Sequence, residues 1–150
     1  MPEKPLTTFG SEKLDKIVNR LKSTPDPRRR YEYILWLSKK LPPLPEDLLQ
    51  EEFKVKGCIS QVYVVGEVKD GHLKWKGFSD ALITKGLLAF LIEGLDGLTP
   101  EEVLAIDPIF IAETGLQASL TPSRANGFLN ILSNMKKQAQ SLITKTTPFS

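Results

Sequence analysis

Apolar residues recur at helical spacing in the first third of the chain, and Ser11 stands where the N-cap of a first helix is expected. The apolar face is formed by Leu14, Ile17, Val18 and Leu21, at positions i, i+3, i+4 and i+7. Asp26 followed by Pro27 predicts the cap and first turn of a second helix, which continues to about Lys40.

The period of the pattern changes in the middle of the chain. Residues 41–47 contain three prolines and are expected to be extended. Residues 60–68 are rich in valine, residues 69–71 read Lys-Asp-Gly, and residues 72–79 alternate between apolar and polar side chains. This pattern predicts an antiparallel hairpin with a tight turn, and a third strand just before Cys58.

Helical spacing returns in the second half. Ser79 and Asp80 are expected to start the most apolar helix, residues 80–93, which must pack on the sheet. Thr99 and Glu102 then have the spacing of a capping box, in which each residue satisfies a backbone N–H of the other.

A second Thr-Pro pair, at Thr121 and Pro122, predicts the start of a long last helix that ends near Lys145. The elements together predict an α+β fold of two layers, in which a small three-stranded antiparallel sheet packs against several helices. We expect a single domain over residues 11–145, with flexible tails at 1–10 and 146–150.

Composition narrows the class of protein. The chain has 150 residues, of which 41% are hydrophobic and 25% are charged, as in ordinary globular proteins. A formal net charge of +2 is too small to indicate binding to nucleic acid or to a membrane surface. The longest apolar run, residues 86–92, is too short to span a bilayer, and the N-terminal residues do not resemble a secretion signal. We therefore expect a protein that is not secreted, in a reducing compartment such as the cytoplasm.

Cys58 is the only cysteine of the chain. A single cysteine is more often a small buried hydrophobe than a reactive group. Gly57, however, permits a positive φ and a sharp turn beside the thiol, and the position lies in a loop between a proline-rich segment and a strand. Ile59 and Val62 add apolar surface, so the thiol could be covered until a partner exposes it.

The rest of the sequence restricts what this thiol can do. The sole histidine, His72, belongs to the hairpin turn and is expected to be solvated rather than to serve as a base. A C-x5-R phosphatase loop would need arginine where Val64 stands, and a C-x-x-C motif would need cysteine at Gln61. One cysteine cannot supply a zinc or iron–sulfur site. Sulfenylation, a mixed disulfide or a persulfide remain, since one sulfur suffices for each.

Other conspicuous residues have ordinary interpretations. The arginines at 28–30 are expected to form a solvated helix face, and Trp36 and Trp75 to be core aromatics. Arg124 lies in the first turn of the last helix, where the helix dipole does not favour a cation. Either an anion or thiolate partner explains it, or it is a surface residue.

Four stretches carry a resemblance to a known family. They are YEYILWLSKKLPPLPEDL, VKGCISQVYVV, SDALITKGLLAFL and LTPSRANGF. In this order and at these spacings the chain resembles the SufE family, the sulfur acceptors of the Suf iron–sulfur assembly system, from about residue 14 to about residue 140. The most distinctive parts are the G-C-x-S-x-V core and the S-R-x-x-G helix start.

The resemblance implies a fold like that of the IscU-type scaffolds and a role in sulfur transfer. The family partner is a cysteine desulfurase whose pyridoxal phosphate takes sulfur from cysteine and leaves it as a persulfide. The SufE thiol accepts that sulfur and passes it to the SufBCD scaffold complex. Such a carrier is a sulfurtransferase-like activator rather than a stand-alone enzyme, binds no cofactor itself, and is expected to be a monomer or weak dimer in the cytoplasm or a plastid-stroma-like compartment.

Residue by residue, the resemblance implies that Cys58 carries the persulfide and that Arg124 supports its anion. It also implies that Gly57, Ser60 and Asp80 belong to the partner-binding surface. The related CsdE branch, with a CsdA-like desulfurase, fits the same motifs as the branch with a SufS-like one. The competing hypothesis is a non-catalytic regulator of a desulfurase, in which Cys58 is secondary.

Overall fold

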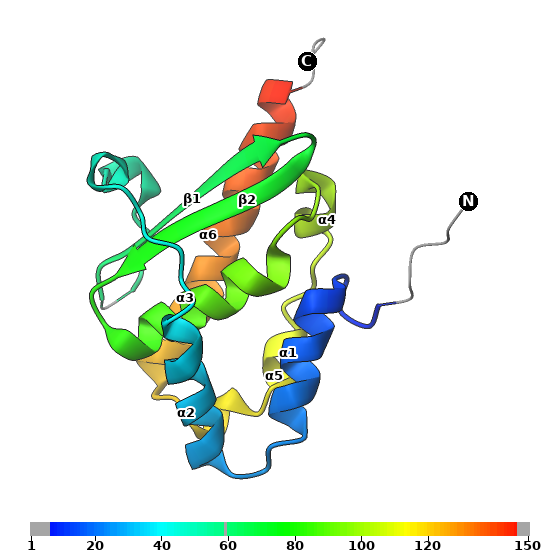
Figure 1. Ribbon diagram of the computed structural model, residues 1–150, viewed down its shortest axis with the longest axis vertical. Helices are drawn as coiled ribbons and strands as arrows, with labels where there is room; N and C mark the ends of the chain where they lie inside the picture. Colours follow the sequence, from blue (N-terminus) through cyan, green and yellow to red (C-terminus); the bar gives the residue numbers. More distant parts are fainter. Residues whose placement is uncertain (1–6, 59, 147–150) are drawn as a thin grey trace.

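The computed structural model describes residues 7–58 and 60–146, which form several helices and one antiparallel hairpin (Figure 1). The helices in chain order are α1 (Glu12–Lys22), α2 (Pro27–Ser38), α3 (Leu82–Leu95), α4 (Pro100–Leu104), α5 (Phe110–Glu113) and α6 (Pro122–Thr146). Short 3₁₀ turns are η1 (Glu46–Leu48), η2 (Glu51–Phe53) and η3 (Leu116–Ala118), and the strands are β1 (Val62–Lys69) and β2 (His72–Ser79). The predicted α+β class is confirmed.

The first two helices begin where their caps predict. The Ser11 hydroxyl accepts from the backbone N–H of Leu14, and an Asp26 carboxylate oxygen accepts from the backbone N–H of Arg28 at 2.9 Å. Each bond satisfies an N–H that has no partner within the helix. The four predicted apolar positions of α1 are all buried.

Strands β1 and β2 pair along their whole length, from Val62 opposite Ser79 to Lys69 opposite His72. Asp70 and Gly71 between them have φ values of 54° and 80°, which gives the turn the twist that a two-residue hairpin needs. In β2, buried and exposed residues alternate strictly, so one face of the hairpin lies against the helices. That face contacts α3 and α6.

The predicted third strand is wrong: within the described residues the sheet has two strands. The segment before Cys58 makes a single isolated bridge, between Lys54 and Tyr63, and Val55 donates to the Val62 carbonyl at 2.8 Å. The 3₁₀ turn η2 ends at Phe53, and Gly57 turns the chain with a φ of 84°. The extended piece between them is too short for a strand ladder.

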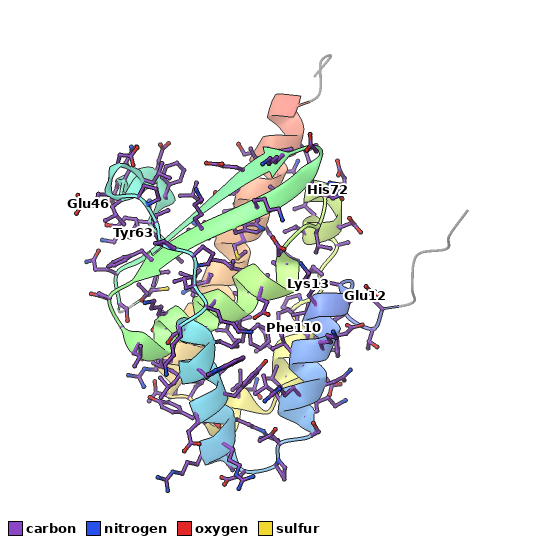
Figure 2. All side chains as sticks on the ribbon, in the orientation of Figure 1. Glu12, Lys13, Glu46, Tyr63, His72 and Phe110 are labelled. Carbon is purple, nitrogen blue, oxygen red and sulfur yellow. The ribbon has the colours of Figure 1, made fainter. Side chains whose placement is uncertain are left out.

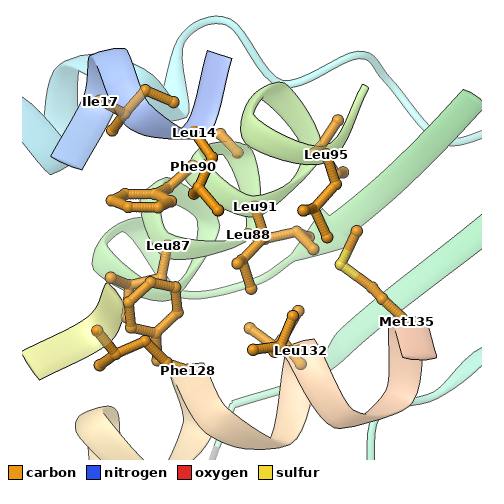
Figure 3. Packing of buried hydrophobic residues seen from close by; sticks show 14 of the residues in the cluster. Leu14, Ile17, Leu87, Leu88, Phe90, Leu91, Leu95, Phe128, Leu132 and Met135 are labelled. Atoms are coloured by element: carbon orange, nitrogen blue, oxygen red, sulfur yellow. The ribbon is translucent and has the colours of Figure 1, made fainter. Parts of the chain in front are cut away.

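Helix α3 is the centre of the core and contacts α1, α2, α6 and β2 (Figure 3). Gly86 allows α2 to approach closely, because a Cβ there would lie 2.6 Å from the Ile34 side chain. The expected start of this helix at residues 79–80 is wrong. It begins at Leu82, since the Asp80 side chain bonds instead to the Gln61 backbone across the end of the hairpin.

The C-terminal part follows the sequence prediction closely. Thr99 and Glu102 form the capping box of α4. Helix α6 begins at Pro122, runs behind the hairpin in Figure 1, and carries a buried apolar stripe. The stripe consists of Phe128, Ile131, Leu132, Met135 and Ala139. Phe90 of α3 and Phe110 of α5 pack edge-to-face against Phe128, with ring centroids 5.2 and 6.3 Å from it.

One aromatic prediction is wrong. Trp75 is buried, but Trp36 is 45% exposed. Ile34 and Leu37, which are completely buried, occupy the face of α2 that lies against α3 and leave Trp36 at the side of the helix.

The ends of the chain were expected to be tails. Residues 1–6 and 147–150 lie outside the described residues. At Thr8 and Phe9 the backbone N–H groups donate to the Asp15 carboxylate, at 2.8 and 2.9 Å, and the Phe9 ring packs on Phe110. None of the helices in the described part of the chain is long and apolar enough to cross a bilayer.

Candidate functional site

Cys58 lies in the loop between η2 and β1, and α6 holds this loop in place. The Asn130 side-chain amide donates to the Gly57 carbonyl at 2.9 Å. Gly57 has a φ of 84°, and a Cβ at that position would lie 2.6 Å from the Asn130 amide nitrogen. The loop therefore needs glycine here for two reasons, its backbone conformation and the space that Asn130 occupies.

The Cys58 thiol points towards the second turn of α6. Its Sγ donates a long hydrogen bond to the Gly127 carbonyl at 3.8 Å, and a Cβ added to Gly127 would lie 3.7 Å from the sulfur. Burial raises the pKa of the Cys58 thiol. A thiolate would also lose its one donated bond and would face a carbonyl oxygen, so the resting side chain is a protonated, half-buried thiol.

A pocket of about 370 Å³ opens beside the sulfur. The polar side chains that line it, apart from the thiol, are hydroxyl groups and one guanidinium, and none is a carboxylate. The lining residues are Cys58, Ser60, Thr84, Thr121, Ser123, Arg124 and Gly127. Hydroxyl and guanidinium donors, at the amino end of a 25-residue helix, suit an anion.

The structure brings three of the predicted site residues together, since Cys58, Ser60 and Arg124 line this one pocket. The Ser60 hydroxyl lies 3.4 Å from that of Thr84, so the two can share a hydrogen bond. Arg124 is exposed, and its backbone N–H is bonded to the Thr121 hydroxyl at 3.4 Å. The fourth residue, Gly57, is adjacent in the loop. Ile59, expected to cover the thiol, lies outside the described residues.

Asp80 lies outside the pocket lining, at the end of the hairpin. Its carboxylate accepts from the Gln61 backbone N–H at 2.9 Å, and its own N–H donates to the Gln61 carbonyl at 3.2 Å. These two bonds fix the chain just after the Cys58 loop. Asp80 therefore has a structural role in the free protein, whether or not it also binds a partner.

Apolar side chains are exposed on the neighbouring surface. Phe78, at the end of β2, is 38% exposed and packs against Tyr63, and Leu82, at the start of α3, is 60% exposed. Both flank Asp80 in the sequence. Exposed apolar groups beside a pocket mark a surface that a partner could cover.

Sequence reasoning did not place Asn130, Thr84 or Thr121 in the site. A signal existed for two of them. Asn130 is three residues after Gly127 and hence on the same helix face, and Thr84 is a polar residue within the most apolar predicted helix. Their partners could not be found from spacing, because each contact joins segments far apart in the chain.

No group of three or more His, Cys, Asp or Glu side chains among residues 7–58 and 60–146 could hold a metal ion. His72 is exposed in the hairpin turn and its Nδ1 lies 2.9 Å from the Asp70 carbonyl oxygen, as expected of a solvated turn residue.

Comparison with known proteins gives a consistent result. A family model described as "SufE: Fe-S metabolism associated domain" matches residues 15–139. An uncharacterised SufE-like protein of Synechocystis is 52% identical over 126 residues, which are 84% of this chain and 79% of that protein. The cysteine desulfuration protein SufE of Plasmodium vivax is 42% identical over 136 residues, 87% of this chain.

Among solved structures, the solution structure of a hypothetical protein from Thermus thermophilus is similar, with a TM-score of 0.78 and 29% identity. The match covers 89% of this chain and 98% of that one. The chain spans only 54% of the length of the Plasmodium vivax relative.

Proposed function

Because the chain belongs to the SufE family, we propose that it accepts persulfide sulfur from a cysteine desulfurase onto Cys58 and thereby stimulates that enzyme. The observation that carries the proposal is the surroundings of Cys58. A lone thiol borders a pocket that contains donors for an anion and neither a histidine nor a carboxylate. A sulfur carrier needs one nucleophilic sulfur and a place for the product anion, and it needs no base of its own.

The transfer is a displacement at sulfur without net oxidation. The Cys58 thiolate attacks the terminal sulfur of the desulfurase persulfide, and a new S–S bond forms at Sγ. The S–S bond of the donor breaks, and its electron pair leaves with the desulfurase cysteine as a thiolate. The proton of the Cys58 thiol must leave first. Because burial raises the pKa of that thiol, we expect the desulfurase to assist this step when it docks.

The pocket would then receive the product. A persulfide is more acidic than a thiol, so the carrier state is anionic at neutral pH. The hydroxyl groups of Ser60 and Thr84 and the guanidinium of Arg124 are the donors that would hold its terminal sulfur. Holding the anion there would shield it from stray thiols until the acceptor arrives.

The docking surface that we propose for the desulfurase combines the Cys58 loop with its neighbours. Gly57 and Ser60 flank the thiol, Asp80 supplies charge, and Phe78 and Leu82 supply exposed apolar area. The partner contributes the pyridoxal phosphate, and we propose the SufBCD scaffold as the final acceptor. A CsdA-like desulfurase is the alternative to a SufS-like one.

The test is incubation with a desulfurase and cysteine, followed by intact-mass measurement. Wild type should gain one sulfur atom, which a reductant removes, and should accelerate the desulfurase. Cys58→Ser should do neither. If Cys58→Ser still accelerates the enzyme fully, the protein is a regulator in which Cys58 is secondary. If it gains the same adduct, Cys58 is not the acceptor.

Arg124 is tested by two variants. Arg124→Ala should lower sulfur acceptance with little change in melting temperature, since the side chain is exposed. Arg124→Lys should restore only part of it, because it keeps the charge but loses the planar pair of donors. A large loss of stability with normal acceptance by the folded fraction would mean that Arg124 only ties down the loop before α6.

A further inference from the structure

A groove of about 1230 Å³ is lined by residues of α1, α2, α3 and β2. It shares no lining residue with the Cys58 pocket. Its floor is apolar and only slightly exposed. The floor consists of Ile17 of α1, Trp75 of β2, and Ala89 and Ile92 of α3, each between 3% and 6% exposed.

The rim of the groove is strongly basic. Six lysine and arginine side chains line it against two carboxylates, Glu93 and Asp96. The carboxylates are already paired. Lys13, which Figure 2 labels on α1, and Lys74 of β2 lie 2.7 and 3.3 Å from Asp96, and Lys40 lies 3.9 Å from Glu93.

Two other lysines of the groove have no such partner. Lys16 of α1 and Lys76 of β2 are exposed, and neither makes an ion pair within residues 7–58 and 60–146. The whole chain carries a net charge of only +2, so this excess of cations is a local feature. It is concentrated around apolar surface, which is where a ligand of opposite charge gains most.

Aromatic rings stiffen the α2 side of the groove. Tyr33 and Trp36 stack with centroids 5.7 Å apart. The Arg20 guanidinium lies 4.8 Å above the Tyr33 ring and the Lys40 ammonium 4.2 Å above the Trp36 ring. These cation–π contacts hold Arg20 and Lys40 at the rim of the groove. Trp36 remains 45% exposed, and packing in the core does not explain its position.

We propose that this groove docks an acidic, amphipathic helical segment of a partner protein. Apolar side chains of the segment would cover the exposed Trp36 ring and the remaining exposed part of the floor. Its carboxylates would meet Lys16 and Lys76 and the cations on the two aromatic rings, Arg20 and Lys40. The volume exceeds that of most small-molecule sites, and a helix laid in a groove is a common way to fill such a shape. Because the Cys58 pocket is separate, the segment can bind while a second protein engages the thiol.

The probe is a fluorescein-labelled peptide of about 16 residues, with leucine along one helix face and glutamate elsewhere. Two control peptides have the same leucine face with lysine for glutamate, or the same composition with the leucines scattered over all faces. Wild type should bind the acidic amphipathic peptide in preference to both controls. The indole N–H of Trp75 is buried without a partner among the described residues. Its NMR resonance should shift when the peptide binds.

The protein variants are matched in charge. Lys16→Glu/Lys76→Glu should weaken binding of the acidic peptide by about tenfold or more. Lys69→Glu/Lys137→Glu makes an equal change of charge at exposed sites outside the groove and should leave the affinity within about twofold of wild type. The groove variant should still accept sulfur on Cys58 at the wild-type rate, which separates this proposal from the proposed function.

Any of four results would overturn the proposal. The first three are equal weakening of binding by both charge reversals, equal binding of the scattered and the amphipathic acidic peptides, and NMR shifts confined to residues of the Cys58 pocket. Self-association of wild type that Lys16→Glu/Lys76→Glu abolishes would also overturn it, because the occupant would then be a second copy of this chain.

Discussion

The hydrogen bond from Asn130 to the Gly57 carbonyl, 2.9 Å long, helps to hold the Cys58 loop against α6. Asn130→Ala removes it and adds no bulk. A typical intramolecular hydrogen bond contributes about 0.5–1.5 kcal/mol, which corresponds to a roughly 2- to 13-fold change in an equilibrium constant. If the thiol reacts only after the loop opens, the open population and the reaction rate should rise by that factor.

The assay is the rate of alkylation of Cys58 by iodoacetamide, followed by intact mass over a pH series. Wild type should be alkylated slowly. The midpoint of its rate-against-pH curve should lie above that of an ordinary thiol, because burial raises the pKa of Cys58. In Asn130→Ala the rate at neutral pH should increase, and the midpoint should move down as the sulfur becomes better solvated. Global stability should fall by no more than about 1.5 kcal/mol.

Asn134→Ala is the matched control. Asn134 lies one turn further along α6, and its side-chain oxygen accepts from the Gln138 amide at 2.8 Å, whereas the Asn130 amide bonds to the Gly57 carbonyl. This variant should leave alkylation unchanged. The reasoning is refuted if Asn130→Ala labels at the wild-type rate, or if the two variants raise the rate equally, since the loop would then open independently of Asn130.

Three further outcomes are expected. Gly127→Ala should stabilise α6 by about 0.5–1 kcal/mol, because alanine favours a helix more than glycine does. It should nevertheless slow sulfur acceptance, because its Cβ would lie 3.7 Å from Cys58 Sγ, on the side proposed for the added sulfur. Sulfur acceptance at the wild-type rate would place the persulfide elsewhere. Burial alone would raise the pKa of Asp96, but hydrogen bonds from two lysines outweigh it and lower that pKa. Asp96→Asn should therefore cost up to about 1 kcal/mol at neutral pH, and urea melts should show the difference disappearing as the pH falls through the lowered pKa. Asp80→Asn keeps an acceptor for Gln61 but loses the charge, so desulfurase affinity should fall at unchanged stability; unchanged affinity would leave Asp80 with its structural bond alone.

Local structure could be predicted from the sequence because its causes are local. Ser11, Asp26 and the Thr99–Glu102 pair satisfy backbone groups within three residues of themselves, so spacing alone located three helix starts. The apolar stripe of α6 was equally readable, since one face of a helix repeats in the sequence. The single thiol behind a glycine was also visible, and so was the family.

The tertiary structure decided everything that depends on two distant segments meeting. Asp80 looked like a helix start but bonds to Gln61, nineteen residues earlier, and the helix begins two residues later. Asn130 holds a loop 73 residues away. The raised pKa of the thiol belongs to the same class, because burial of Cys58 is produced by the packing of its loop on α6. A sequence pattern reports which face of an element is apolar, but the partner of that face, and the solvation of a side chain beside it, are fixed only when the elements pack.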